Sequence, residues 1–101
     1  MDIATDGQTL RLSGELDART TWKVRAAIHD HLDAVEGDAV VDVTEVRAVD
    51  LTALRVLAFA TRRAHAEGRR LTLRGCCPAV RRMLHLSRLY PRVEVENGLI
   101  A

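Results

Sequence analysis

Four histidines and two adjacent cysteines are the residues of this 101-residue chain that could hold a metal ion or act as nucleophiles. His29 and His31 are two positions apart on an expected helix, so their side chains point to different sides and cannot hold one metal ion between them. Cys76 and Cys77 alone lack the two further ligands of a structural zinc site. A disulfide between neighbouring residues is strained, which favours two reduced thiols in a cytoplasmic protein. We therefore expect no bound metal and no cofactor.

The sequence lacks the short motifs that position reacting groups or bind phosphates in common enzymes. No serine lies in a nucleophile elbow, and neither a glycine-rich phosphate loop nor a dinucleotide fingerprint is present. Glu15 and Asp17 are close in sequence, but a loop that leaves a strand normally carries acidic residues for solvation. We therefore predict that the protein is not an enzyme, because no catalytic site assembles from these residues.

The other residues that could do chemistry are Asp50 and Thr52, which flank Leu51 at the start of an expected helix. Asp50 could accept a hydrogen bond from a first-turn N–H group, which would stabilise the helix by about 0.5–2 kcal/mol. Thr52 could serve the same N–H groups, or it could accept a phosphate, because a helix N-terminus favours an added anion. Leu51 either packs against the preceding loop 44–49 or, if it is exposed, contacts a partner.

Strand patterns place these residues in a sheet. Residues 9–14 and 70–75 alternate leucine with polar residues, which is typical of strands with one exposed face. Residues 3–5 can pair with the first of these strands across the turn at Asp6 and Gly7. Residues 39–43 are almost all apolar, which predicts a central strand covered on both faces. Residues 93–96 are expected to form an edge strand.

Three helix patterns alternate with the strands. The first helix is expected to begin at Thr20 or Thr21 and to end at Gly37. The second spans about 51–66, and the third begins at Pro78. Their expected inner faces are Val24, Ala27, Ile28, His31, Leu32 and Val35; Leu54, Leu57, Ala58 and Thr61; and Ala79, Val80, Met83, Leu84 and Ser87. The order predicts a single α/β domain over residues 1–101, with a mixed, mostly parallel sheet and helices packed against it.

Composition and charge exclude several classes of function. Hydrophobic residues make up 48% of the chain, yet no apolar run approaches the roughly 20 residues that cross a bilayer. The acidic N-terminus predicts that there is no signal peptide. Residues 1–50 carry a net charge of −6 and residues 51–101 one of +7, which either mix on the surface or steer a charged partner. Basic residues come in scattered pairs and aromatic residues are few, so we expect neither nucleic-acid binding nor membrane insertion.

Three segments together carry a resemblance to a known family. They are LRLSGELDART (10–20), VVDVTEVRAVDLTALRVL (40–57) and LTLRGCCPAVRRMLHLSRL (71–89). In this order and spacing they resemble the STAS domain family of sulphate transporters and anti-sigma factor antagonists, over about Leu10 to Val95. The resemblance implies a STAS-like fold and a small cytoplasmic bacterial protein. Such a protein binds an anti-sigma factor, often a kinase, and so frees a sigma factor for transcription.

The resemblance also gives the Asp50 turn a regulatory meaning. Family members that act as phospho-switches have a hydroxyl residue directly after the aspartate, and this hydroxyl accepts phosphate from the partner kinase. Here that position is Leu51, the second family serine is Thr52 and the family glycine is Ala53. We favour the interpretation that the binding surface is kept and the phosphate switch is lost. The alternative makes Thr52 the acceptor, although one step along a helix rotates a side chain by about 100°.

The segments 17–21 and 44–53 are expected to leave the sheet at the same end and to form one partner-binding patch. Its predicted residues are Asp17, Arg19, Val49, Asp50, Leu51, Thr52 and Ala53. Asp17 could instead cap the first helix. The predicted partner is an anti-sigma factor. Two alternatives stay open: an accessory subunit of a membrane transport complex, such as a lipid-transporting ABC system, and a module that binds a nucleotide or another small ligand.

Overall fold

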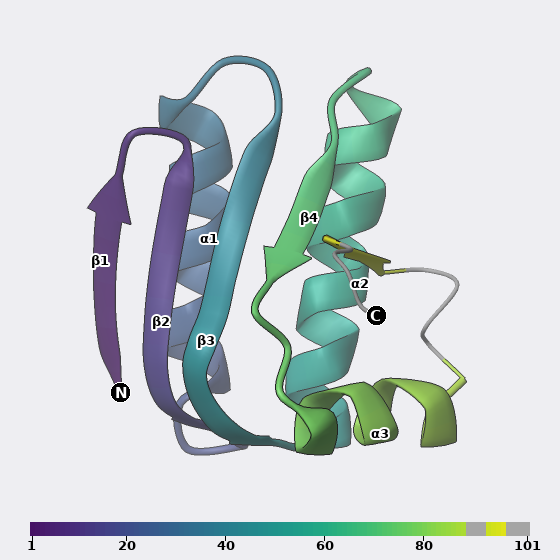
Figure 1. Cartoon of the computed structure of the whole chain (residues 1–101). Coiled ribbons are helices and arrows are strands. Elements are labelled where there is room, and N and C mark those ends of the chain that lie inside the picture. The colour runs from purple at the N-terminus through teal and green to yellow at the C-terminus, as the bar shows by residue number, and fades with distance from the viewer. Residues whose placement is uncertain (89–92, 97–101) are drawn as a thin grey trace.

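The computed structural model describes residues 1–88 and 93–96, and this part of the chain alternates strands with helices (Figure 1). The elements are β1 (Asp2–Asp6), β2 (Thr9–Leu16), α1 (Thr21–Ala34), β3 (Ala39–Val49), α2 (Leu51–Ala66), β4 (Leu71–Arg74), α3 (Pro78–Leu86) and β5 (Glu94–Val95). This is the predicted order. The predicted α/β class is confirmed.

The five described strands form one mixed sheet in the order β1-β2-β3-β4-β5. β1 and β2 pair antiparallel across the predicted turn at Asp6 and Gly7, and the remaining neighbours pair parallel. α1 and α2 lie side by side behind the sheet, and α3 lies near the end where β3 finishes (Figure 1). This arrangement brings the ends of β2 and β3 and the start of α2 to one end of the molecule.

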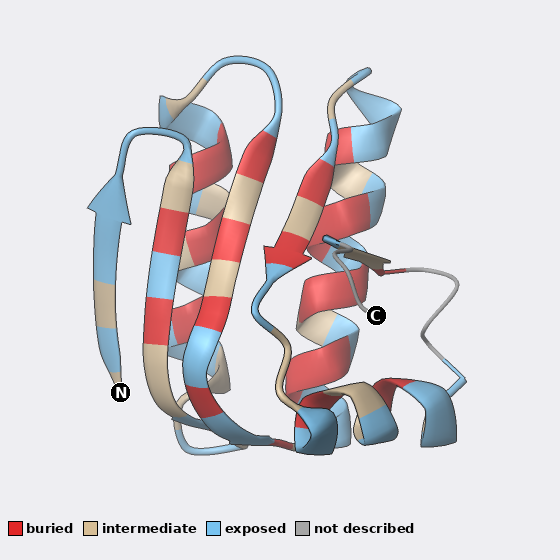
Figure 2. Cartoon of the chain, in the orientation of Figure 1, coloured by how far each residue is buried: buried red, intermediate tan, exposed pale blue. Residues whose placement is uncertain are grey.

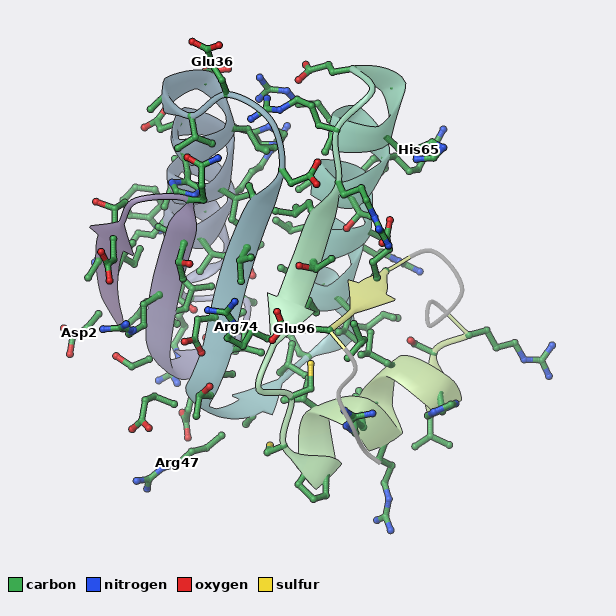
Figure 3. All side chains as sticks on the ribbon, turned by 45° about the horizontal axis from the view of Figure 1, so that its top comes forward. Asp2, Glu36, Arg47, His65, Arg74 and Glu96 are labelled. Atoms are coloured by element: carbon green, nitrogen blue, oxygen red, sulfur yellow. The ribbon has the colours of Figure 1, made fainter. Side chains whose placement is uncertain are left out.

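Only one face of β3 is covered, so the prediction of a strand buried on both faces is wrong. Ala39, Val41 and Val43 are buried toward the helices, whereas Val40 and Asp42, which alternate with them, are half-buried (Figure 2). The open face carries a row of charges in register, in which Arg11 lies opposite Asp42 and Asp42 lies opposite Arg74. Figure 3 shows Arg74 and Glu96 pointing toward one another, with 2.9 Å between the Arg74 Nε and a Glu96 oxygen.

β3 also continues to Val49, through the segment 44–49 that was predicted as a loop. Thr44 and Glu45 are both exposed, so the apolar alternation stops, but β3 continues to pair with β2 up to Leu16 opposite Val49. Register shifts in this pairing mark bulges, which keep the strands hydrogen-bonded while the side-chain pattern changes.

The inner faces of the helices form the core. The fully or largely buried helical residues are Val24, Ile28, His31, Leu32, Ala53, Leu54, Leu57, Ala58, Ala60, Thr61, Ala64, Val80 and Leu84. His31 Nε2 forms a 2.8 Å hydrogen bond with the Gln8 carbonyl oxygen, so this histidine is a satisfied core residue. Ala79 is exposed, contrary to prediction, because the inner stripe of α3 begins one residue later at Val80. None of the described helices is long and apolar enough to cross a membrane.

Candidate docking surface

The predicted patch residues follow two neighbouring parallel strands. Leu16 at the end of β2 lies opposite Val49 at the end of β3, and the Asp50 N–H donates a 3.0 Å hydrogen bond to the Leu16 carbonyl oxygen. Asp17 and Asp50 are therefore the first residues after two strand ends that are tied together. The structure places the two segments side by side at the carboxyl ends of β2 and β3. Open α/β folds place their sites at the carboxyl ends of the strands.

Asp50 caps α2. Its backbone is extended, and its carboxylate oxygen Oδ1 accepts a 2.9 Å hydrogen bond from the Ala53 N–H. This bond satisfies one of the N–H groups that the first helical turn leaves without a partner in the helix. The predicted capping role of Asp50 is confirmed, and it fixes the direction in which the following residues emerge.

Leu51 and Thr52 point outward from the first turn of α2. Leu51 keeps 40% of its surface exposed, so it does not fill the core in the way that Leu54 and Leu57 do. Thr52 is exposed, and its hydroxyl makes no hydrogen bond within residues 1–88 and 93–96. The expectation that Thr52 helps to satisfy the first-turn N–H groups is therefore wrong, because Asp50 already serves them from the cap position.

Two predicted contact residues, Val49 and Ala53, are buried. Val49 is the last β3 residue on the helix-facing side, and Ala53 lies one position before Leu54 on the inner face of α2. Their side chains contact the core and cannot reach a partner. They support the turn, while the accessible part of it is formed by Leu51 and Thr52.

Asp17 and Arg19 form a local ion pair beside the turn. The Asp17 carboxylate accepts hydrogen bonds from the Arg19 backbone N–H at 2.9 Å and from the Arg19 guanidinium at 2.7 Å. These bonds lower the pKa of Asp17 below its ordinary value. The carboxylate makes no bond to α1, whose cap position is Thr20, so the alternative of Asp17 as the helix cap is wrong. Arg19 is highly exposed and is available to a partner.

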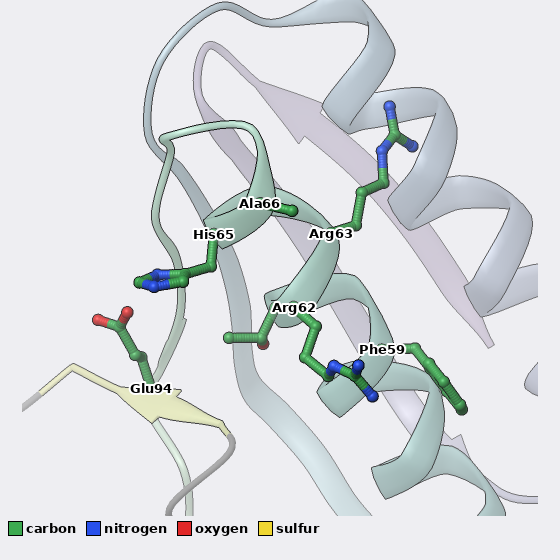
Figure 4. A pocket seen from close by; sticks show the side chains of 7 residues that line it. Phe59, Arg62, Arg63, His65, Ala66 and Glu94 are labelled. Carbon is green, nitrogen blue, oxygen red and sulfur yellow. The ribbon is translucent and has the colours of Figure 1, made fainter.

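A hollow with a volume of about 920 Å³ lies between α2 and β5 (Figure 4). Its lining residues are Phe59, Thr61, Arg62, Arg63, His65, Ala66 and Glu94. His65 points toward Glu94, while Arg62 and Phe59 point away from them (Figure 4). Among residues 1–88 and 93–96 there is no cluster of three side chains that could hold a metal ion.

Sequence reasoning considered only the inward faces of the helices and therefore missed two exposed aromatic side chains, Trp22 and Phe59. Both lie outside the inner stripes of α1 and α2. Both could have been found from the sequence, because they lie outside the apolar repeat that predicts the inner face of each helix. A large apolar side chain in such a place does not pack into the core.

Comparisons with known proteins identify the fold and the family. A model of the family described as Mlab, STAS domain, matches residues 1–91. No curated protein of similar sequence is found. The anti-sigma factor antagonist SpoIIAA in its unphosphorylated form is similar in structure, with a TM-score of 0.73 and 22% identity over 96% of this chain and 88% of that chain.

Two further solved structures share the fold. An anti-sigma factor antagonist from Mycobacterium paratuberculosis gives a TM-score of 0.79 and 22% identity, over 96% of this chain and 84% of that one. The phosphorylated form of the Bacillus cell fate determinant SpoIIAA gives a TM-score of 0.67 and 19% identity, over 96% of this chain and 91% of that chain. These likenesses establish the fold, and the family model confirms the resemblance predicted from the sequence. The chain belongs to the Mlab family of STAS domains.

Proposed function

We propose that this protein is a cytoplasmic bacterial binding module that performs no chemistry of its own and docks another protein at the turn between β3 and α2. The observation that carries the proposal is the exposed Leu51–Thr52 pair on a turn fixed by the Asp50 cap. An exposed leucine at the start of a helix leaves apolar surface in water, and covering it contributes free energy to the binding of a partner. Arg19 lies on the adjoining segment and supplies a charge at the rim.

The partner that we propose is an anti-sigma factor, in particular one with a kinase fold. Support comes from the structural likeness to proteins named as anti-sigma factor antagonists. Leu51 has no hydroxyl, so a phosphate cannot be placed directly after Asp50. Binding would then be constitutive, or controlled by the amount of either protein and not by phosphorylation at this position.

The same leucine favours a second candidate function. An antagonist under kinase control needs the acceptor hydroxyl, whereas an accessory subunit of a membrane transport complex does not. The second candidate is therefore a subunit that docks on a transporter component, including one of a lipid-transporting ABC system, through the same exposed turn.

A capture experiment from the native cell distinguishes the two candidates. The full chain is immobilised as wild type, as Leu51→Glu and as Leu86→Glu. Leu86 is a matched control because it is an exposed leucine on α3, with 71% of its surface accessible. We expect an anti-sigma factor to bind the wild type and Leu86→Glu and to be lost from Leu51→Glu. Recovery of a transporter component with the same pattern would establish the second candidate, and retention of either partner by Leu51→Glu would contradict docking at this turn.

A further inference from the structure

A groove runs between the outer faces of α1 and α2. It consists of two adjoining hollows of about 510 and 550 Å³, which share Arg25, His29, Thr52 and Val56. The complete lining is Thr21, Trp22, Arg25, Ala26, His29, Thr52, Arg55, Val56, Phe59 and Arg63. Trp22 and Phe59 are 68% and 63% exposed, which is unusual for side chains of this size. The groove therefore offers apolar surface that the rest of the described chain does not cover.

The lining residues follow helical spacing on both helices. Thr52, Val56, Phe59 and Arg63 lie at positions i, i+4, i+7 and i+11 of α2, so they form one continuous stripe. This stripe is about 16 Å long, or three helical turns. It begins at Thr52, so the groove opens directly onto the docking turn described above. A groove between two helices that is three turns long fits a third helix.

The charges along the groove are positive and largely unpaired. Arg25 and Arg55 are exposed and form no ion pair within the described residues. No acidic side chain lines either hollow. An occupant with acidic side chains on its flanks would pair with both arginines, and a basic occupant would be repelled.

Arg63 connects the two helices at the far end of the groove. Arg63 of α2 reaches α1, where its guanidinium donates to the Asp33 carboxylate and lies 2.9 Å from His29 Nδ1. It also binds the Glu67 carboxylate at 3.1 Å. Because Arg63 already has these partners, its charge is satisfied inside the molecule. The free charges of the groove are therefore concentrated toward the Thr52 end.

We propose that the α1–α2 groove binds an amphipathic helix of a partner protein, with leucine-like residues over Trp22, Val56 and Phe59 and acidic residues beside Arg25 and Arg55. The proposal rests on the proposed function, because it extends docking from the turn along the helices. It defines the chemistry of the bound segment, namely an acidic helix of about three to four turns.

Trp22 is the only tryptophan of the chain, so its fluorescence reports occupation of the groove. The probe is a synthetic helical peptide of about 18 residues, or five turns, with leucines along one stripe and glutamates on its flanks. A second peptide has lysine in place of every glutamate. We expect only the acidic peptide to shift the Trp22 emission to shorter wavelength and to protect it from acrylamide quenching.

Variants of the full chain test the charges and the apolar surface separately. Arg25→Glu with Arg55→Glu should weaken binding of the acidic peptide by at least about tenfold, and should favour the lysine peptide. The matched control is Arg47→Glu with Arg82→Glu, which makes the same change of net charge at exposed arginines outside the groove. Phe59→Ser should weaken binding at unchanged charge. Circular dichroism verifies that each variant is folded.

The outcomes separate this inference from the proposed function. Leu51→Ala should leave peptide affinity within about twofold, because Leu51 does not line the groove. The groove proposal would be contradicted if neither peptide shifted the emission or if both peptides bound equally. It would also be contradicted by preferential binding of an oligonucleotide, or by an emission shift that appears without peptide when the protein concentration is raised. Failure of the docking turn would appear only in the capture experiment, as retention of the native partner by Leu51→Glu.

Discussion

The resemblance to phospho-switches predicts a hydroxyl directly after Asp50, where this chain has Leu51, and the structure leaves Leu51 exposed on the first turn of α2. The Asp50 cap depends on the backbone N–H of Ala53 and not on the side chain at position 51. The turn can therefore keep its shape whichever residue follows Asp50. We therefore propose that the side chain at position 51 decides whether this turn can carry a phosphate.

We expect incubation with the cognate kinase and ATP to leave the segment 50–53 unmodified. Leu51→Ser restores a hydroxyl on an unchanged backbone and should become phosphorylated under the same conditions. Peptide mapping by mass spectrometry measures both. Phosphate found on Thr52 of the wild-type chain would reverse this interpretation and make Thr52 the acceptor.

Replacement of Gly75 should lower the free energy of unfolding more, per added atom, than replacement of any other residue. Its φ of +78° lies in the left-handed region, and an added Cβ would come within 2.0 Å of the Thr44 hydroxyl oxygen and 3.0 Å of the Thr44 Cα. Gly68 has a similar φ of +76° but open space around it. Gly68→Ala should cost about 1 kcal/mol from backbone strain alone. Gly75→Ala should lower the free energy of unfolding by roughly 2–4 kcal/mol, as measured by urea unfolding. An equal loss for Gly75→Ala and Gly68→Ala would mean that Thr44 does not pack against Gly75.

The Cys76 thiol gives the domain a dependence on alkaline pH. Burial raises the pKa of this thiol to about 11, while a thiol in an unfolded chain titrates near 8.5. The folded state therefore holds the proton more tightly, and its contribution to stability is complete below about pH 8.5 and is lost as the pH rises to about 11. Over that interval the free energy of unfolding of Cys76→Ala should fall less than that of wild type. The free energy of unfolding of Cys77→Ala, which keeps the Cys76 thiol, should fall by as much as that of wild type.

At the scale of elements, periodicity predicted the helices well and the strand ends poorly. The inner stripe of α2 follows from the spacing of Leu54, Leu57 and Thr61, because helical side chains three and four positions apart share a face. The end of β3 did not follow, because bulges keep the backbone paired after the apolar alternation stops. For the same reason Val49 was expected to be accessible and is buried. The cap at Asp50 was predictable because it depends on residue type and local spacing alone.

Leu57→Ala tests how α2 packs. Leu57 is almost completely buried, so the substitution should lower the free energy of unfolding by about 2–5 kcal/mol through lost contacts and the cavity left behind. Phe59→Ala removes a larger side chain from the exposed side of the same helix and should cost less than about 1 kcal/mol. Guanidinium unfolding measures both values. A smaller loss of free energy for Leu57→Ala than for Phe59→Ala would mean that the Phe59 side of α2, and not the Leu57 side, faces the core.

At the scale of the whole molecule, the strands follow chain order across the sheet, so the two halves of the chain lie on opposite sides (Figure 1). Because the described elements of the two halves do not interleave, the arrangement favours a separation of their opposite net charges over mixing on the surface. Such a separation orients a charged partner before contact and makes association depend on salt. The docking turn and the helical groove lie where the two halves meet, since α1 belongs to the first half and α2 to the second.

The most direct test of docking at the β3–α2 turn is the affinity of the purified partner for three forms of the full chain, measured by titration calorimetry. We predict that wild type and Leu86→Glu bind equally, and that Leu51→Glu binds at least about tenfold more weakly, because a carboxylate would be buried in an apolar contact. Circular dichroism and thermal unfolding should be the same for all three forms. Equal affinity of wild type and folded Leu51→Glu would contradict the account, because the partner would then bind elsewhere on the domain.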